Sequence, residues 1–137
     1  MVKYYLDTCI WIDLLEDRKG PKDEHFGEFA FRLLSLIKLQ GHKVIISDHL
    51  IQEIKSRFWM ESIQIVFGRL GGSIERVSHN IDQASEARQV RKNVRVPYGD
   101  VLHAILARDC SAILVTRDKH FKKLADIAIA FRPEELF

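Results

Sequence analysis

The sequence contains few cysteines, whose disulfides stabilise many secreted proteins. Its 137 residues include two cysteines, Cys9 and Cys110, which lie far apart and form no CxxC pair. This scarcity excludes a disulfide framework and a cysteine-based zinc site, and it fits a reducing compartment. We expect both cysteines to be small buried hydrophobic side chains and not reactive thiols.

Long hydrophobic runs are also missing. No apolar run approaches the roughly 18 residues that are needed to span a membrane. Acidic residues interrupt the N-terminal segment where a signal peptide would carry its apolar core. These residues are Asp7, Asp13, Glu16 and Asp17. The sequence therefore predicts a cytoplasmic protein that makes no contact with a membrane.

The chain has no large excess of charge of either sign. It has 21 basic and 19 acidic residues, and its 47% hydrophobic content is ordinary for a globular protein. The length fits a single domain over residues 1–137. Two basic clusters suit a polyanion, although each taken alone is better explained as a solvated helix face. One cluster is Arg88, Arg91, Lys92 and Arg95, and the other is Arg117, Lys119, Lys122 and Lys123.

Short apolar runs alternate with amphipathic segments along the chain, and they predict strands and helices respectively. Strands are expected over Lys3–Asp7, where the strand stops on a carboxylate, and over Lys43–Ile46, Ile74–Val77 and Ala112–Thr116, with a fifth, edge strand over Ile127–Ala130. Helices are expected over Cys9–Leu15, His25–Gln40, Ser47 or Asp48 to Phe58, Met60–Leu70, Asn80–Lys92, Asp100–Asp109 and Lys119–Leu124. The alternation indicates an α/β fold in three layers, with a central parallel sheet of four or five strands and helices on both faces.

Cap and turn residues support several of these boundaries. Gly41 suits the left-handed residue that closes a helix, and Asn80 and Gln83 are spaced like a capping box. Pro97–Gly99 is expected to form a turn before the next helix. The residues after Pro133 are expected to form a tail.

Three aspartates and one glutamate lie just beyond strands or near the starts of helices. They are Asp7, Glu53, Asp100 and Asp118. In open α/β sheets, active sites form in the crevice beyond the carboxyl ends of the strands. Read singly, each has a simpler explanation, because an Asp before a helix is often only an N-cap. Read together, they predict one acidic site.

Helical periodicity leaves two questions open. Glu53 lies beside the apolar stripe of its helix, about 60° from Leu50, but Asp48 flanks the opposite edge and remains an alternative. His103 lies one face away from Asp100 on the next helix, where a hydrogen-bonded structural histidine is favoured over a catalytic one.

Several carboxylates in one apolar-walled pocket would repel one another and take up protons unless a cation were present. Oxygen ligands without cysteine or clustered histidine indicate Mg²⁺ or Mn²⁺ and not zinc. Such an ion activates a water and stabilises charge on a phosphoryl group, which leads from these residues to phosphodiester hydrolysis.

Four segments carry a resemblance to a known family. They are Leu6–Ile12 (LDTCIWI), Ser47–Ile54 (SDHLIQEI), Tyr98–Ala104 (YGDVLHA) and Val115–Phe121 (VTRDKHF). In this order, and over nearly the whole chain, they resemble the PIN-domain nucleases, of the compact type found in VapC toxins. The resemblance implies strand order 3-2-1-4-5, a homodimer and, for a toxin, a cognate antitoxin protein that blocks the site. The segment Pro21–Asp23 and the helices on either side of it are candidate contact surfaces for these partners.

The resemblance also implies a set of site residues and a reaction. One or two Mg²⁺ or Mn²⁺ ions would be bound, and an activated water would attack a phosphodiester of RNA. Thr116 matches the family's hydroxyl residue near the metal, and Thr8 lies beside the first acid as a supporting residue. The implied ligands and catalytic residues are Asp7, Glu53, Asp100 and Asp118.

Arg117 and Lys119 are expected to guide a single-stranded or looped RNA, because duplex RNA does not bend easily into a narrow cleft. Two alternatives remain open. One is an RNA-processing PIN nuclease that has no antitoxin. The other is a non-enzymatic, Mg²⁺-binding phospho-receiver module, which is disfavoured because a receiver needs paired acids after the first strand and only Asp7 stands there.

Overall fold

A five-stranded parallel sheet runs through the computed structural model, which describes residues 1–137. The strand order is β3-β2-β1-β4-β5, with β1 at the centre, and every neighbouring pair is parallel. The order implied by the family resemblance is therefore confirmed. The strands are β1 (Lys3–Leu6), β2 (Lys43–Ser47), β3 (Ile74–Val77), β4 (Ile113–Val115) and β5 (Ala130–Phe131).

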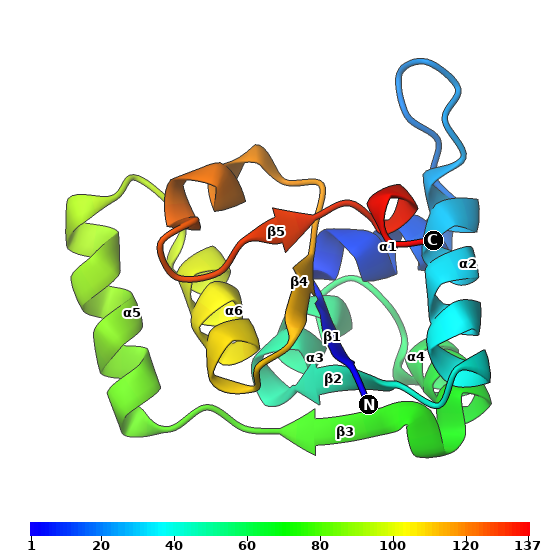
Figure 1. Ribbon diagram of the computed structural model, residues 1–137, viewed down its shortest axis with the longest axis horizontal. Coiled ribbons are helices and arrows are strands. Elements are labelled where there is room, and N and C mark those ends of the chain that lie inside the picture. The colour runs from blue at the N-terminus through cyan, green and yellow to red at the C-terminus, as the bar shows by residue number, and fades with distance from the viewer.

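Helices cover both faces of the sheet, so the predicted three-layer α/β fold is confirmed (Figure 1). One face carries α1 (Thr8–Glu16), α2 (Phe26–Leu39), α3 (Asp48–Lys55) and α4 (Met60–Leu70). The other carries α5 (Ile81–Asn93), α6 (Tyr98–Asp109) and the 3₁₀ helix η2 (Lys119–Leu124). Two more 3₁₀ turns are η1 (Gly71–Ser73) and η3 (Pro133–Glu135). None of these helices has the length and apolar character that crossing a membrane requires.

Neighbouring residues of the central strands enter two different cores. Tyr5 and Ile45 pack with α5, α6 and η2, whereas Leu6 and Ile46 pack with α1 to α4. All four are fully buried, because successive side chains of a strand point to opposite faces and both faces are covered. Burying each one stabilises the fold by about 1.5–3 kcal/mol. This double burial explains why the strands read as continuous apolar runs.

Two of the predicted helix caps are present in the structure, but the turn predicted before α6 is not. Gly41 has φ of 73°, and the Asn80–Gln83 capping box forms with hydrogen bonds of 2.8 and 2.9 Å. Helix α6 begins at Tyr98, so the expected turn at Pro97–Gly99 is wrong. The Pro97 carbonyl accepts the N–H of Asp100 at 3.1 Å. Asp100 therefore lies in the first helical turn and is not the N-cap.

The C-terminal part of the chain also differs from expectation. The edge strand is Ala130–Phe131 and not Ile127–Ala130, because the N–H groups of Ile127 and Ala128 both donate to the Leu124 carbonyl and close the turn after η2. The residues after Pro133 are not a free tail. Pro133 is buried at the first position of η3, where its missing N–H costs nothing.

A buried cluster of charges fastens this C-terminal turn to the rest of the protein. Arg117, which follows β4, donates to both oxygens of Glu134 at 2.6 and 2.8 Å. Its Nε lies 3.5 Å from Asp13 Oδ2, and its guanidinium stacks 3.8 Å from the centre of the Phe26 ring. The side chains of Arg117 and Asp13 are only 13% and 6% exposed. This arginine is therefore part of the framework of the fold.

Replacing this arginine is expected to unfold the protein more easily. Arg117→Ala should lower the free energy of unfolding by about 3 kcal/mol, because it removes this partner from the buried carboxylate of Asp13 and the partly buried carboxylate of Glu134. The control is Arg108→Ala, since Arg108 forms a more exposed bidentate pair with Glu86 at 2.7 Å. That variant should lose about 0–1 kcal/mol. Urea unfolding measures both, and equal losses would contradict the framework role of Arg117.

Candidate active site

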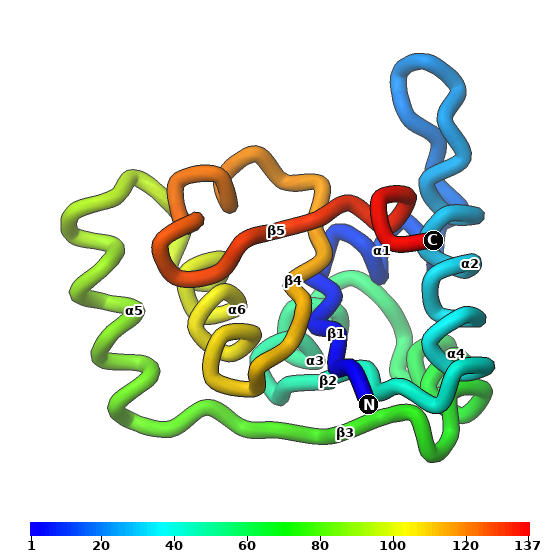
Figure 2. Tube along the Cα trace, in the orientation of Figure 1, coloured from blue at the N-terminus to red at the C-terminus, as the bar shows by residue number.

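The carboxyl ends of β1, β2 and β4 meet where the strand order of the sheet reverses. From β1 the chain moves to β2 on one side, and β4 then pairs with β1 on the other side. Figure 2 traces β1 into α1 and β4 into η2 at this same end of the sheet. The Asp7 N–H donates to the Val115 carbonyl at 2.9 Å and holds the two strand ends together. Such a reversal leaves the crevice that ligands use in open α/β sheets.

Asp7 is the central carboxylate of this crevice and is 4% exposed. Its Oδ1 accepts the Thr8 N–H at 2.8 Å, so the simple explanation, a cap for α1, is also true. Its Oδ2 accepts the Thr116 hydroxyl at 2.9 Å. Thr116 in turn accepts the N–H of Asp118 at 3.0 Å. Thr116 therefore joins the carboxylate after β1 to the backbone of the carboxylate after β4.

Glu53 reaches the crevice from α3, whereas Asp48 does not. The Thr8 hydroxyl donates to Glu53 Oε1 at 2.5 Å, and His103 Nε2 forms a hydrogen bond with the same oxygen. Asp48 is exposed and pairs with Arg76 of β3 at 3.1 Å. Of the two residues that helical periodicity left open, Glu53 therefore lies at the crevice and Asp48 lies outside it.

His103 stands in a buried chain of hydrogen bonds that ends at the acidic crevice. Its side chain is fully buried, and its Nδ1 lies 2.6 Å from the Tyr5 hydroxyl, which lies 2.7 Å from Ser47 Oγ. Its Nε2 faces Glu53 and lies 3.7 Å from Asp7 Oδ1. The expected hydrogen-bonded histidine is present, and the same ring also contacts the carboxylates.

Asp100 and Asp118 form the more open part of the site. His120 Nδ1 lies between them, 3.1 Å from Asp100 Oδ2 and 3.2 Å from Asp118 Oδ1. Asp118 also caps η2, since its Oδ1 accepts the His120 N–H at 2.9 Å. An imidazole thus sits where a cation would balance the two carboxylates.

The charges of the site act on one another. Burial, followed by the negative charges of Asp7 and Asp118, raises the pKa of Asp100 to about 6. Burial also opposes ionisation of Glu53, but the hydrogen bond and charge of His103 and the Thr8 hydroxyl outweigh it and hold the pKa of Glu53 at about 2. Repulsion between these carboxylates raises the pKa of one of them, and a divalent cation would reduce that repulsion. The carboxylate oxygens of Asp7, Asp100 and Asp118 are donors of the kind that divalent cations bind.

Two histidines of the site were missed by sequence reasoning. His49 Nε2 lies 3.7 Å from Glu53 Oε2, and His120 bridges the two aspartates described above. A signal for His49 was present, because residues four apart on a helix share one face. Gly99 makes room for this arrangement. A Cβ there would lie 2.9 Å from Glu53 Oε2 and 3.2 Å from His49 Nε2.

The cysteines take no part in this chemistry. Cys9 and Cys110 are both half-buried and unpaired. Burial raises the pKa of each thiol, most strongly that of Cys9. Both therefore stay protonated at neutral pH, as expected of unreactive thiols.

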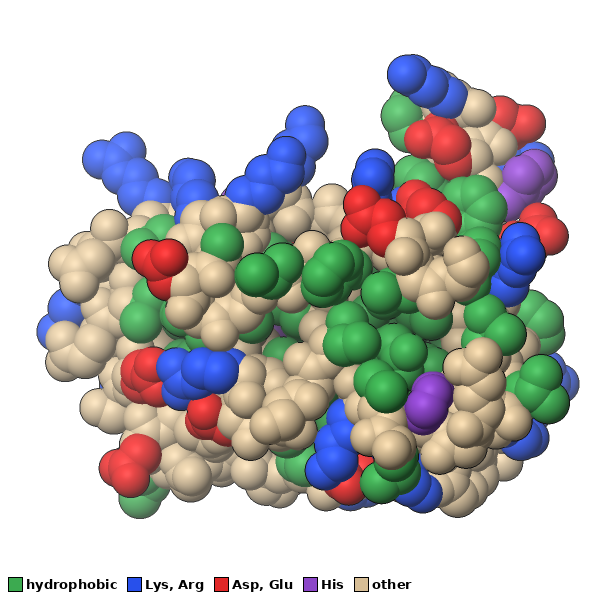
Figure 3. Space-filling view, in the orientation of Figure 1, with side chains coloured by type: hydrophobic (Ala, Val, Ile, Leu, Met, Phe, Trp, Pro, Cys, Tyr) green, Lys and Arg blue, Asp and Glu red, His purple; other side chains and the backbone are tan.

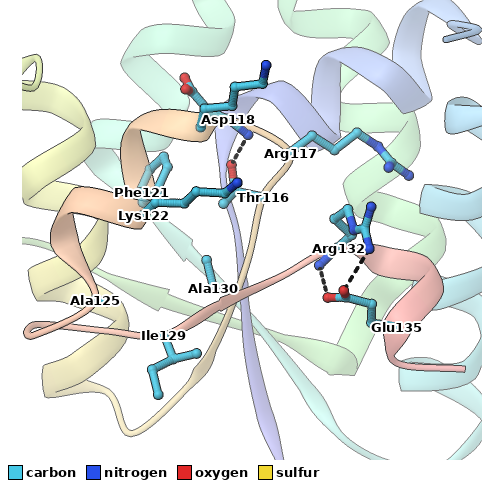
Figure 4. Close-up of a pocket in the computed structure, with 11 residues that line it drawn as sticks. Thr116, Arg117, Asp118, Phe121, Lys122, Ala125, Ile129, Ala130, Arg132 and Glu135 are labelled. Atoms are coloured by element: carbon cyan, nitrogen blue, oxygen red, sulfur yellow. Dashed lines mark hydrogen bonds and ion pairs between the residues drawn. The ribbon is translucent and has the colours of Figure 1, made fainter.

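A hollow of about 570 Å³ adjoins Asp118 between η2 and β5 (Figure 4). Its rim includes the exposed side chains of Lys119 and Lys122. Figure 3 shows Lys and Arg side chains standing out along the edge of the molecule where η2 lies. Arg117 also borders the hollow, but its guanidinium is committed to Glu134. Lys119 is thus exposed at the rim, whereas the side chain of Arg117 is 13% exposed, and contact of either residue with RNA stays a prediction.

The doubly wound parallel sheet, with carboxylates gathered at its point of strand reversal, defines an α/β protein with an acidic site. The sequence profile of the PIN domain family matches residues 4–127, so the chain belongs to the PIN domain family. None of the curated proteins matches the chain by sequence.

Solved structures share this fold over nearly their whole length. VapBC2 from Rickettsia felis, bound to a DNA fragment from its promoter, has a TM-score of 0.67 and 20% identity, covering 96% of this chain and 98% of that chain. VapBC-1 from nontypeable Haemophilus influenzae has a TM-score of 0.66 and 17% identity, covering 97% and 99%. A toxin-antitoxin complex from Klebsiella pneumoniae has a TM-score of 0.65 and 20% identity, covering 95% and 97%.

The raised pKa of Asp100 has a consequence for stability. Because its pKa is above the ordinary value, folding favours the protonated carboxyl, and this stabilisation is lost as pH rises through about 6. With divalent cations removed, Asp100→Asn should therefore raise Tm at about pH 7.5 by about 4 °C, and the gain should vanish near pH 4.

Thermal unfolding of two variants checks this expectation. Asp82→Asn, an exposed replacement in the first turn of α5, should give no gain at either pH. A lower Tm for Asp100→Asn at neutral pH, or a gain that persists in acid, would contradict the repulsion described here.

Proposed function

We propose that the protein is a metal-dependent endoribonuclease that hydrolyses RNA phosphodiester bonds as the toxin of a toxin–antitoxin pair in the cytoplasm. The observation that carries this proposal is the convergence of Asp7, Glu53, Asp100 and Asp118 at the strand reversal of a PIN domain. All four family acids are present, so the site has the charge that divalent cations require.

The residues of this site have different proposed roles. These carboxylates would hold Mg²⁺ or Mn²⁺, which would supply an activated water and a positive charge against the charge that develops on the phosphodiester. Asp7, Asp100 and Asp118 offer the carboxylate oxygens. The Thr116 hydroxyl fixes the orientation of Asp7, and Thr8 holds Glu53 with a hydrogen bond of 2.5 Å.

Removal of the central charge tests the proposed reaction. Asp7→Asn should reduce cleavage of a single-stranded RNA in Mg²⁺ or Mn²⁺ by at least about 100-fold. The variant should still fold, because asparagine also caps helices well. The matched control is Asp48→Asn, since Asp48 lies on α3 but faces Arg76 and should leave activity unchanged. Full activity of Asp7→Asn would refute the proposal.

The basic hollow beside Asp118 supports a single RNA strand as the substrate. Lys119 and Lys122 stand at its rim, and Ile129, which is 67% exposed, lines it with apolar surface. Lysines pair with phosphates, and an apolar surface can contact the face of an unstacked base. We therefore place the nucleotides that flank the cleaved bond in this hollow.

Replacing both lysines of the rim should weaken RNA binding and leave the chemical step intact. Lys119→Ala combined with Lys122→Ala should raise KM by about tenfold with little change in kcat, and it should reduce the dependence of binding on salt. Arg88→Ala combined with Arg91→Ala, in the exposed basic cluster of α5, is the control. Equal increases in KM for the two double variants would contradict the proposal that RNA binds in this hollow.

An antitoxin that blocks the acidic site can also bind a second surface of the protein. A second hollow, of about 500 Å³, lies between α1, α2 and α4 and is mostly apolar. Phe31 within it is 59% exposed, and Lys38 and Arg69 stand beside it. We propose that an apolar segment of the antitoxin, flanked by acidic residues, binds here. The complexes of similar fold described above support a protein partner. That the protein forms a homodimer is likewise a proposal.

A charged residue in this apolar hollow should separate toxicity from neutralisation. Phe31→Asp should keep RNA cleavage and growth arrest but escape protection by a co-expressed product of the neighbouring gene. Ile65→Asp, on α4 and also 59% exposed but outside the hollow, should remain protected. If expression of the wild-type protein causes no growth arrest, the RNA-processing alternative replaces the toxin.

A further inference from the structure

A line of hydrogen-bonded polar groups runs from the interior of the protein to Glu53. It begins at the Leu50 N–H, which donates to Ser47 Oγ at 3.0 Å. Ser47 Oγ lies 2.7 Å from the Tyr5 hydroxyl, and that hydroxyl lies 2.6 Å from His103 Nδ1. On the other side of the ring, His103 Nε2 forms a hydrogen bond with Glu53 Oε1. Side chains of β1, β2 and α6 thus lead to one carboxylate of α3.

Stability alone does not explain why this line is polar. Ser47, Tyr5 and His103 are all fully buried, and Tyr5 lies in an otherwise apolar core beside Ile45 and Leu102. A buried polar group costs free energy unless it is hydrogen-bonded, and replacing both partners of such a bond by apolar groups of the same shape is often neutral or stabilising. What the three side chains share is the path to Glu53.

His103 holds one oxygen of Glu53 by donating to it. An ionised carboxylate can only accept hydrogen bonds, so the proton of this bond is on His103 Nε2. The Thr8 hydroxyl donates to the same oxygen at 2.5 Å. A glutamate side chain loses conformational entropy when it is held in one position, and these two bonds offset that loss. Oε1 is therefore fixed by donors from α1 and α6.

The second oxygen of Glu53 is left without a donor. His49 Nε2 lies 3.7 Å from Oε2, which is too long for a hydrogen bond. Gly99, which precedes Asp100, leaves room for this oxygen, because a Cβ there would lie 2.9 Å from it. Oε2 is thus the oxygen that Glu53 can offer to a cation, and it lies beside the helix start that carries Asp100.

We propose that His103, supported by Tyr5 and Ser47, is a positioning residue that directs Glu53 toward the cation of the acidic site. This role rests on the proposed nuclease function and extends it to buried side chains that do not touch the substrate. A hydrogen-bond partner behind a metal ligand fixes the direction of that ligand, and its loss typically costs about 10–100-fold in metal affinity or activity. Thr8 alone would then hold Glu53 less well.

NMR spectroscopy of the metal-free full chain, isotope-labelled at its histidines, tests the contact without relying on activity. The Nε2–H proton of His103 should exchange slowly with water, because the side chain is fully buried. Its signal should shift in Glu53→Gln and in Tyr5→Phe. The matched control is Tyr4→Phe, since Tyr4 packs against the core on the other face of the sheet. A His103 ring that carries no proton on Nε2 would overturn the proposal.

Kinetics below the unfolding temperature separate positioning from a purely structural role. Tyr5→Phe keeps the ring and removes the hydroxyl, so it should lower kcat for RNA cleavage in Mn²⁺ by about tenfold, with KM for RNA changed by less than about twofold. Tyr4→Phe should leave both unchanged. A lower Tm for Tyr5→Phe with an unchanged kcat would mean that the hydroxyl serves only the fold.

A conservative replacement of the histidine gives a second measurement. His103→Gln keeps an N–H donor for Glu53 and should retain kcat within about threefold, whereas His103→Leu removes the donor and should lose at least about tenfold. Equal losses in the two variants would contradict the role of the donor. If His103→Leu fails to fold, Tyr5→Phe carries the test.

The outcomes also distinguish this proposal from the function on which it rests. RNA cleavage by the wild-type protein together with an unchanged kcat in Tyr5→Phe would overturn the positioning role alone. Absence of cleavage by the wild-type protein in Mg²⁺ and in Mn²⁺ would overturn the proposed nuclease and this role together.

Discussion

The pairing of β1 with β4 is the contact on which the site depends. It aligns Leu6 with Val115, and it thereby places Asp7 within 2.9 Å of the Thr116 hydroxyl, 109 residues away in the sequence. A slip of one residue in this register would turn Tyr5 and Leu6 toward the wrong cores. Because those side chains are fully buried, the cores hold the register, and the register holds the carboxylates together.

The same constraint explains why stability and function oppose each other at this place. The sheet brings Asp7, Asp100 and Asp118 close enough for the charges of the first and last to raise the pKa of Asp100. The fold therefore carries a repulsion that a hydrophobic or neutral crevice would lack. Thr116, Thr8 and His103 offset part of it through hydrogen bonds to Asp7 and Glu53.

Much of the fold was predictable because its signals are local. Apolar runs buried on both sides mark β1 and β2, and Gly41 and the Asn80–Gln83 box mark helix ends through backbone geometry that neighbours do not alter. The start of α6 was missed because Pro97 reads as a turn residue, although its carbonyl opens the helix. The position of β5 was missed because two residues paired at an edge leave little pattern.

The meeting of the carboxylates at one end of the sheet was predictable, whereas the residues around them were less so. Strand ends locate Asp7 and Asp118 from sequence, but the choice between Glu53 and Asp48 depends on how α3 packs against α6. The histidines of the site depend on the same packing. In the sequence, Arg117 belongs to a basic cluster. Its ion pairs could not be predicted, because its partners, Asp13 and Glu134, come near it only in the folded chain.

The most direct test of the central claim is anomalous diffraction from crystals of the protein grown with Mn²⁺. The claim is that the carboxylates at the strand reversal form one cation-binding centre. It predicts a manganese peak in contact with carboxylate oxygens of Asp7, Asp100 and Asp118. Crystals that hold manganese elsewhere but show no peak among these residues would contradict it.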